Sequence, residues 1–397
     1  MADHAGASRV ARRHAERAAR RRRRIRRTLI AFLVAIAVVG GAFGAGALLR
    51  DDEPPRAAPT TTTTTVAPTT TTVAAVPTTI PRDPRRGSGQ PVTFAFGGDT
   101  HFEGGLRTKL RDDPAGMLGP VAPVLSSVDI AMVNLETAIT ERGTAADKEF
   151  TFRTPAAAML ALGAAGVDVV TIANNHGIDY GPDGLADTLL VKGTVPAPAI
   201  VGIGANAAEA FTPYRVEIRG QRIAIFGATD VLDGNVIDAW TATDAQAGLA
   251  SAKDPARLVA AVQAARLDSD TIVVFLHWGA EGETCANERQ KELAQTLVDA
   301  GADIIVGSHS HRVEGGGRLG TAFVAYGLGN YIWYNESGPS GESGTLLVTA
   351  TGRDIDAYSW APAVIRGGVP EPTPPGPDAD AAVAEWNALR ECAGLAP

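Results

Sequence analysis

The chain has 397 residues, of which 45% are hydrophobic and 20% charged, so it is long enough for one large domain or two average ones. Its net charge of −8 divides unevenly. Residues 1–50 hold 12 Arg against Asp3 and Glu16, which gives +10, and residues 51–397 hold 24 basic against 42 acidic side chains, which gives −18. The acidic balance of this larger part argues against nucleic acid as a partner.

The first 49 residues have the pattern of a membrane anchor. Residues 9–27 contain eleven Arg and no Lys, and residues 28–49 contain no charged side chain. About 20 apolar residues cross the hydrocarbon layer, and basic flanks stay in the cytoplasm. We predict a cytoplasmic Arg-rich arm (1–27), one transmembrane helix in the cell membrane (28–49) and an extracytoplasmic main domain. A cleaved signal peptide is the alternative, because Ala45-Gly-Ala47 resembles a cleavage site.

A linker, one domain and a tail follow. Residues 50–90 are rich in Pro and Thr, which predicts an extended, disordered stalk that buries no core. Between residues 91 and 366, apolar runs of strand type alternate with Ala- and Leu-rich stretches of helical type. Residues 367–397 form a Pro-rich tail with a predicted short helix over 381–390.

In chain order, strands are predicted over residues 92–96, 130–133, 167–172, 214–218, 222–226, 271–276, 303–306, 322–326 and 345–349. Helices are predicted over residues 155–165, 182–192, 255–267 and 288–300. Strands that are apolar throughout and alternate with helices belong to sheets with covered faces. The sequence therefore predicts a layered α/β protein, in which a hairpin around Gly220 makes the sheet mixed.

Polar side chains gather directly after these predicted strands. Ligands of open α/β sheets bind at the carboxyl ends of the strands. Of the seven His in the chain, His4 and His14 lie in the arm and the other five follow predicted strands. The polar residues at these ends are Asp99, His101, Asn134, Glu136, Asn174, Asn175, His176, His277, Glu281, His309, His311 and Asn330. Imidazole and carboxylate ligands suit divalent metals, and two such ions a few ångströms apart promote hydrolysis.

Several of these residues also have an ordinary structural interpretation. Asn134 and Asn174 are typical of turns, where they bond the backbone. His277 beside Trp278 is typical of a partly buried histidine, and Glu281 of a solvated carboxylate. Their joint placement after successive strands is what favours a metal site.

The strand-end segments, in this order, resemble one protein family. They read Phe96-Gly-Gly-Asp99, Val133-Asn-Leu-Glu136, Ile172-Ala-Asn-Asn-His-Gly-Ile-Asp-Tyr-Gly181, Leu276-His-Trp-Gly-Ala-Glu281, Val306-Gly-Ser-His-Ser-His311 and Tyr326-Gly-Leu-Gly-Asn-Tyr331. Over about residues 92–331 the chain is similar to the CapA family of poly-γ-glutamate capsule synthesis proteins, whose domain is related to calcineurin-like metallophosphatases. The resemblance implies a four-layer α/β/β/α sandwich with a metal centre between strand ends.

The metallophosphatase pattern, with its Asp-x-His and Asn-His pairs, is matched at Asp99, His101, Asn175 and His176. Two positions depart from it. Ser308 separates Gly307 from the His-x-His segment, although both His remain, and Glu136 stands where the pattern has a bridging Asp.

The resemblance implies a metal-dependent hydrolase or transferase that acts outside the membrane. One or two divalent ions (Mn, Zn, Fe or Mg) would be held by Asp99, His101, Glu136, Asn175, His277, His309 and His311. His176 would protonate the leaving group. The residues expected around the ligands or the substrate are Asn134, Asn174, Glu281, Asn330, Arg153 and Arg312. The substrate would be a phosphoester or the γ-glutamyl amide of an anionic polymer.

A second hypothesis is a non-catalytic subunit that binds or exports the polymer. It would belong to a capsule synthesis complex, with other membrane proteins of capsule synthesis as partners.

Cys285 and Cys392 lie in the part predicted to be outside the cytoplasm, where disulfides persist. We predict that they pair and clamp the tail to the loop after His277. Two unpaired buried thiols are the alternative.

Overall fold

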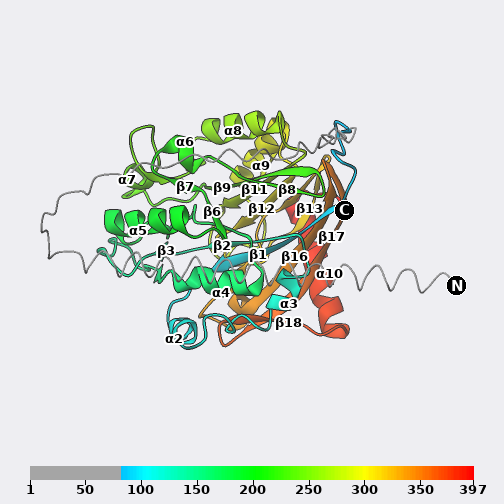
Figure 1. Ribbon diagram of the computed structural model, residues 1–397. Helices are drawn as coiled ribbons and strands as arrows, with labels where there is room; N and C mark the ends of the chain where they lie inside the picture. The colour runs from blue at the N-terminus through cyan, green and yellow to red at the C-terminus, as the bar shows by residue number, and fades with distance from the viewer. Residues whose placement is uncertain (1–81) are drawn as a thin grey trace, which may run out of the picture.

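The computed structural model describes residues 82–397 (Figure 1). The predicted arm (1–27), the predicted transmembrane helix (28–49) and residues 50–81 of the predicted linker lie outside the described residues. Within residues 82–397, no helix has both the length and the apolar character needed to cross a bilayer.

Two mixed sheets form the centre of the domain (Figure 1). In the first sheet, the strands on one side of β1 run parallel to it and those on the other side continue as antiparallel neighbours. In sheet order the strands are β18 (Val369–Pro372), β17 (Asp354–Arg366), β16 (Glu342–Thr351), β1 (Val92–Thr100), β2 (Ile130–Leu135), β5 (Val169–Thr171) and β6 (Ala199–Val201), and β15 (Asn330–Ile332) pairs with the end of β1.

The second sheet has parallel central strands and an antiparallel hairpin at each edge. Its order is β13 (Gly316–Leu319), β14 (Ala322–Ala325), β12 (Ile304–Ser308), β11 (Thr271–His277), β9 (Gln221–Thr229) and β8 (Tyr214–Ile218). The predicted hairpin around Gly220 joins β8 and β9. Two short pairs complete the strands: β3 (Ala138–Ile139) with β4 (Arg153–Thr154), and β7 (Ile203–Gly204) with β10 (Gly248–Leu249).

Alternation along each strand produces three cores. Phe96 of β1 and Phe275 of β11 belong to the core between the two sheets, whereas Leu276, the next residue of β11, faces the helices behind the second sheet. The outer face of the first sheet is covered by α2 (Gly105–Asp112), α3 (Ala122–Leu125), α4 (Ala157–Ala165) and α5 (Gly181–Thr194). The outer face of the second is covered by α6 (Ala207–Ala210), α8 (Ala256–Arg266) and α9 (Glu288–Ala300). The layers are therefore α/β/β/α, as expected.

Each predicted strand and helix of the domain corresponds to an observed one, with ends shifted by a few residues. The thirteen-residue β17 was not predicted, because its exposed face carries polar residues such as Asp356 and Ser359 that interrupt any apolar run. Five short helical segments also lacked a prediction: α2, α3, α6, α7 (Ile237–Trp240) and the 3₁₀ turn η1 (Gly338–Gly341).

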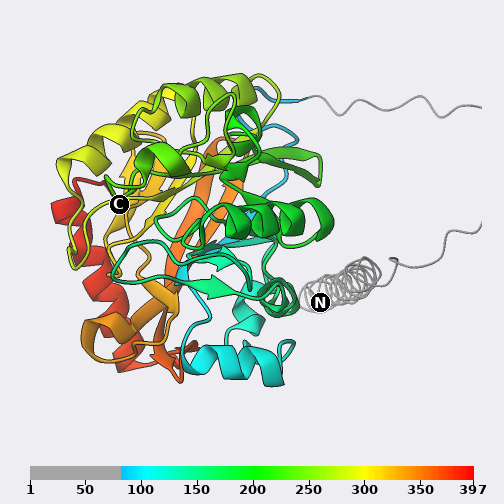
Figure 2. The same ribbon diagram turned by 90° about the vertical axis from the view of Figure 1, so that its left-hand side faces the viewer.

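The tail is more ordered than the predicted short helix over 381–390. Its first residues form β18, and α10 (Pro377–Ala393) is seventeen residues long. Pro377 at the first position favours helix initiation, Asp378 lies in the first turn, and Gly394 ends the helix with a φ of 70°. Figure 2 shows α10, in red, along one edge of the domain, where it inserts Trp386 into the core between the sheets.

The last nine residues of the predicted linker, 82–90, lie against the domain. The Gln221 side-chain amide donates hydrogen bonds to the backbone carbonyls of Arg86 and Gln90, at 2.8 and 2.9 Å. The Arg82 guanidinium pairs with Asp270, the residue just before β11. Residues 82–90 therefore bind at the amino end of β11, whereas His277 ends the same strand on the other side.

Gly98 allows β1 and β15 to approach closely. A Cβ at this position would lie 1.9 Å from the carbonyl oxygen of Gly329. The same carbonyl accepts a hydrogen bond from the backbone N–H of Asp99 at 2.9 Å, and Asp99 is paired with Asn330 in the strand register. The glycine thus fixes where two of the candidate site residues lie.

We expect Gly98→Ala to lower the free energy of unfolding by about 3 kcal/mol, because its methyl group meets backbone that no rotamer change can move. Urea denaturation measures the change. Gly193→Ala is the matched control: it lies in α5 with no atom within 4 Å of the added Cβ, and helix propensity predicts a gain of up to about 1 kcal/mol. Equal effects of the two substitutions would contradict this account of Gly98.

Candidate metal centre

The candidate residues from both sheets meet at the carboxyl ends of the parallel strands. Asp99, at the end of β1, accepts a hydrogen bond from the backbone N–H of His309, which follows β12, at 3.1 Å. Asn175, in the loop after β5, places its Oδ1 2.8 Å from Nε2 of His277, the last residue of β11. The joint placement inferred from the sequence is therefore present across the two sheets.

Two groups of three side chains have the spacing of a metal site. In each group, one potential ligand atom per residue lies within 4.8 Å of the others. The first group is Glu136, His277 and His309, and the second is Asp99, Glu136 and His311. Glu136 belongs to both groups, which is the placement that a carboxylate bridging two neighbouring ions would need.

The side chains present fit a divalent cation. Four buried atoms at the site form no hydrogen bond with any described residue: both carboxylate oxygens of Glu136, Nδ1 of His309 and Nε2 of His101. Buried polar atoms are nearly always bonded, so the unbonded carboxylate of Glu136 beside the unbonded Nδ1 of His309 indicates a place for a positive ion. Nε2 of His101 carries the ring proton, because Nδ1 of that ring accepts from the backbone N–H of Glu103 at 3.0 Å. A donor set of imidazole and carboxylate suits Mn, Zn or Fe.

The imidazoles are held in the form that binds metals. Burial lowers the pKa of His101 and His309 to about 3, and it lowers the pKa of His277 well below its usual value. These rings are therefore neutral at physiological pH, the charge state that metal ligation requires. Burial also raises the pKa of Glu136 well above its usual value, a bias that a bound cation would reverse.

Asp99 and His311 pair at the edge of the cluster. Their side chains are separated by 3.1 Å between Oδ2 and Nδ1. Burial opposes ionisation of both groups, but the hydrogen bond between them lowers the pKa of Asp99 and raises that of His311. Asn330 supports the pair, because its Oδ1 lies 3.0 Å from the same nitrogen of His311.

Two asparagines, Asn134 and Asn174, hold the candidate ligands in place through hydrogen bonds. The Asn134 amide donates to Oδ1 of Asp99 at 2.8 Å and lies 3.1 Å from Nδ1 of His277. Asn174 donates to Oδ1 of Asn134 at 3.0 Å, and its own oxygen accepts from the backbone N–H of His176. The bonds of these asparagines are therefore made to site residues rather than only to turns.

His176 is oriented by a residue that the sequence interpretation did not single out. Its Nδ1 lies 2.5 Å from Oδ2 of Asp179, and its Nε2 faces Glu136 at 3.9 Å. Asp179 is fully buried and also accepts from Lys148 at 3.0 Å and from the backbone N–H of Phe152 at 2.7 Å. The only sequence signal for it is the His-x-x-Asp spacing between His176 and Asp179.

His101 lies beside the two groups and belongs to neither. Its ring is enclosed by Phe152, Trp333 and Tyr334, with centroid distances of 4.7, 4.2 and 4.7 Å. Phe152 also stacks on His176, at 4.2 Å. An aromatic wall therefore closes this side of the site.

Three of the expected surrounding residues are not drawn into the cluster. The Arg153 guanidinium lies over the ring of Tyr180, 4.6 Å from its centroid. Arg312 lines a separate cavity, and Glu281 is exposed. The predicted disulfide between Cys285 and Cys392 is present.

Fold and cluster define a two-sheet α/β domain with a site suited to a divalent metal. Residues 93–335 match the family described as bacterial capsule synthesis protein PGA_cap. Because this match covers more than half of the chain, the chain belongs to that family, which confirms the resemblance seen in the strand-end segments.

Individual relatives are similar over part of their length. The chain is 31% identical over 259 residues to the PGA biosynthesis protein CapA of Bacillus subtilis, an alignment that covers 62% of this chain and 66% of that protein. It is 32% identical over 222 residues to the capsule biosynthesis protein CapA of Bacillus anthracis, covering 54% and 52%. A "probable polyglutamine synthesis accessory protein" of Mycobacterium tuberculosis is 31% identical over 193 residues, covering 47% and 50%. The chain thus spans less than two thirds of each relative.

Solved structures are more distant. A hypothetical protein from Thermus thermophilus has a TM-score of 0.42 at 16% identity, covering 69% of this chain and 100% of that one. The sulfate thiohydrolase SoxB of Thermus thermophilus has a TM-score of 0.38 at 15% identity, covering 72% and 46%.

Proposed function

We propose that this protein is a metal-dependent hydrolase or transferase that acts on a γ-glutamyl polymer during capsule or surface-polymer synthesis. Its family membership and the names of its relatives support the biological setting. The proposal of catalysis rests mainly on Glu136. Its two carboxylate oxygens are buried and unbonded, and it belongs to both groups of potential metal ligands. We place the domain outside the cytoplasm, anchored at the cell membrane through residues 28–49.

The ligand set would hold one or two divalent ions at Asp99, Glu136, His277, His309 and His311, with Asn175 and His101 beside them. A divalent ion bound there supplies Lewis acidity and lowers the pKa of a nearby water.

His176 is placed to deliver a proton: burial lowers its pKa, and the hydrogen bond to the carboxylate of Asp179 opposes that effect by favouring the protonated ring. Asp179 accepts from Nδ1 of this ring, which fixes the ring orientation and leaves Nε2 turned toward the cluster. A proton carried on Nε2 can pass to the nitrogen of a γ-glutamyl leaving group, or to the oxygen of a phosphoester. The aromatic wall of Phe152 and Trp333, both 6% exposed, limits the access of bulk water from that side.

Turnover by the metal-loaded protein tests the proposal. The protein is stripped with a chelator, reloaded with Mn²⁺, Zn²⁺ or Fe²⁺, and incubated with poly-γ-glutamate and with a phosphodiester. We expect His176→Ala to keep its metal, measured by elemental analysis, and to lose about 10²- to 10⁴-fold in kcat. Glu217→Gln, an exposed position on β8, is the control and should change neither value.

Two outcomes would count against catalysis. If the loaded wild type cleaves neither substrate, the enzyme proposal fails, and binding of poly-γ-glutamate without cleavage would favour the non-catalytic polymer-binding subunit. If His176→Ala turns over like the wild type, the proposed role of His176 is wrong even though the metal site stands.

A further inference from the structure

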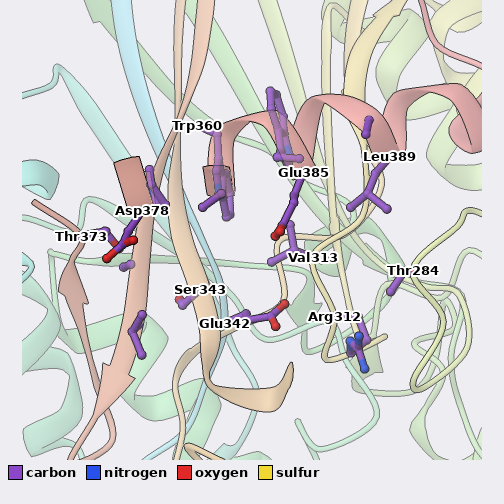
Figure 3. Close-up of a pocket in the computed structure, with 16 residues that line it drawn as sticks. Thr284, Arg312, Val313, Glu342, Ser343, Trp360, Thr373, Asp378, Glu385 and Leu389 are labelled. Carbon is purple, nitrogen blue, oxygen red and sulfur yellow. The ribbon is translucent and has the colours of Figure 1, made fainter. Parts of the chain in front are cut away.

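A second cavity lies away from the candidate metal centre, between α10 and the strands β16 and β17 (Figure 3). Its volume is about 480 Å³, within the range of pockets that hold small ligands. Trp360 and Trp386 both line it, and their rings stack at a centroid distance of 5.9 Å and an angle of 9°. The ring of Trp360 lies flat on β16, since a Cβ at Gly344 would come within 2.3 Å of it.

The charged residues of this cavity are mostly acidic. Glu342, Asp378, Glu385 and Arg312 line it, which leaves an excess of two negative charges. Figure 3 shows Glu385 on α10 and Glu342 on β16 directed toward the same space, with Arg312 at one end. Within residues 82–397, none of these four side chains has a salt-bridge or hydrogen-bond partner for its charged group. Unpaired charges at a cavity are available to a ligand.

Trp386 forms part of the cavity wall by packing. The side chain lines the cavity and is 3% exposed, and it belongs to the core between the sheets. Its stacked partner Trp360 is 6% exposed, so the two rings form a rigid apolar floor.

The cavity is connected to the metal centre through two residues. Ser343, on its wall, donates to the backbone carbonyl of Asn330 at 2.7 Å, and Oδ1 of Asn330 lies 3.0 Å from His311. Arg312 directly follows His311. A ligand in the cavity would therefore contact the back of the loop that carries a candidate metal ligand.

We propose that this cavity binds a lysine side chain of a peptide segment from a partner protein. The ammonium group would lie between the carboxylates of Glu342 and Glu385. The aliphatic stem would lie against the apolar part of the wall that the stacked tryptophans form. The excess of carboxylates disfavours a polyanion, so this site differs in ligand from the proposed polymer site and does not depend on it.

Titration calorimetry on the full chain with acetylated trilysine amide tests the proposal. We expect saturable binding that weakens at high salt, and no binding of the matched trinorleucine peptide, which lacks the ammonium groups. The double variant Glu342→Gln/Glu385→Gln should lose at least about tenfold in affinity. Glu217→Gln is the control for a carboxylate elsewhere on the surface. Glu136→Gln should bind trilysine like the wild type, which separates this site from the metal centre.

The proposal is overturned if trilysine and trinorleucine bind equally, if the double variant binds like the wild type while retaining its circular dichroism spectrum, or if trilysine does not bind. Binding of a neutral oligosaccharide such as cellotriose in place of trilysine would also overturn it and would reassign the tryptophans to a sugar. Reduction of the disulfide between Cys285 and Cys392 should weaken trilysine binding, because it releases α10, which forms one wall of the cavity.

Discussion

Replacing Glu136 with glutamine is expected to abolish tight metal binding and, at the same time, to stabilise the metal-free protein. Glu136 is fully buried, and neither of its oxygens has a hydrogen bond among the described residues. It also lies in both groups of potential ligands, so its loss removes a ligand from each. We expect the affinity for Mn²⁺ or Zn²⁺, measured by titration calorimetry, to fall by at least about a hundredfold, or about 2.7 kcal/mol.

The effect on the metal-free protein has the opposite sign. Burial, with Asp99 nearby, raises the pKa of Glu136 in the folded state above its usual 4.5. The wild type therefore loses stability as the pH rises above that value, because the carboxyl group then ionises more readily in the unfolded chain than in the folded one. Glutamine does not ionise. The free energy of unfolding of metal-free Glu136→Gln should therefore equal that of the wild type at low pH and exceed it, by about 1–3 kcal/mol, as the pH rises.

The control for this experiment is Glu217→Gln, an exposed carboxylate on β8. It should change metal affinity by less than about threefold and leave the stability of the metal-free protein unchanged. A Glu136→Gln variant that binds metal like the wild type would show that Glu136 is buried for another reason and would remove the main support for the proposed centre.

Removal of the disulfide between Cys285 and Cys392 is expected to be the largest stability loss of any single change outside the core. The bond joins residues 107 apart and attaches α10 to the loop after β11. Chain entropy predicts a cost of about 4–5 kcal/mol for opening a loop of this length. We expect Cys285→Ser/Cys392→Ser to lower the free energy of unfolding by about that amount, measured by urea denaturation.

A reductant provides the internal control. The wild type should fall to the stability of the double serine variant in reducing buffer, whereas the variant should be indifferent to it. Loss of α10 would also expose Trp386, which is 3% exposed in the folded protein, so its fluorescence should shift toward that of solvated indole. A double variant as stable as the oxidised wild type would contradict the role assigned to the bond.

Strand and helix positions were largely predictable because the strands of this domain are covered on both faces. Such strands are apolar throughout, as in Thr271–His277, and their ends are visible as the point where polar residues begin. The edge of the first sheet could not be predicted in the same way. In β17, buried and exposed residues mix along thirteen positions, so no single periodicity marks the strand.

The candidate site was predictable as a set of residues but not as a network. Five histidines after strands point to one edge of the fold, and Asp99, Glu136, His277, His309 and His311 do lie together there. The partner of His176 was not predictable, since Asp179 reads as an ordinary residue before a helix until the loop is folded. Arg153, in contrast, was expected near the ligands or the substrate, but its guanidinium lies over the ring of Tyr180.

Residues 82–90 and the candidate metal centre lie at opposite ends of strand β11. These residues bind beside Asp270, at the start of β11, and the candidate centre lies at the other end of that strand, about 20 Å away over its seven residues. The chain therefore enters the domain at one end of β11, and the candidate metal ligands lie at the other end of the same strand. The strand-end loops that carry these ligands thus lie away from residues 82–90, so changes in residues 82–90 should alter the stability of the domain without altering the ligand set.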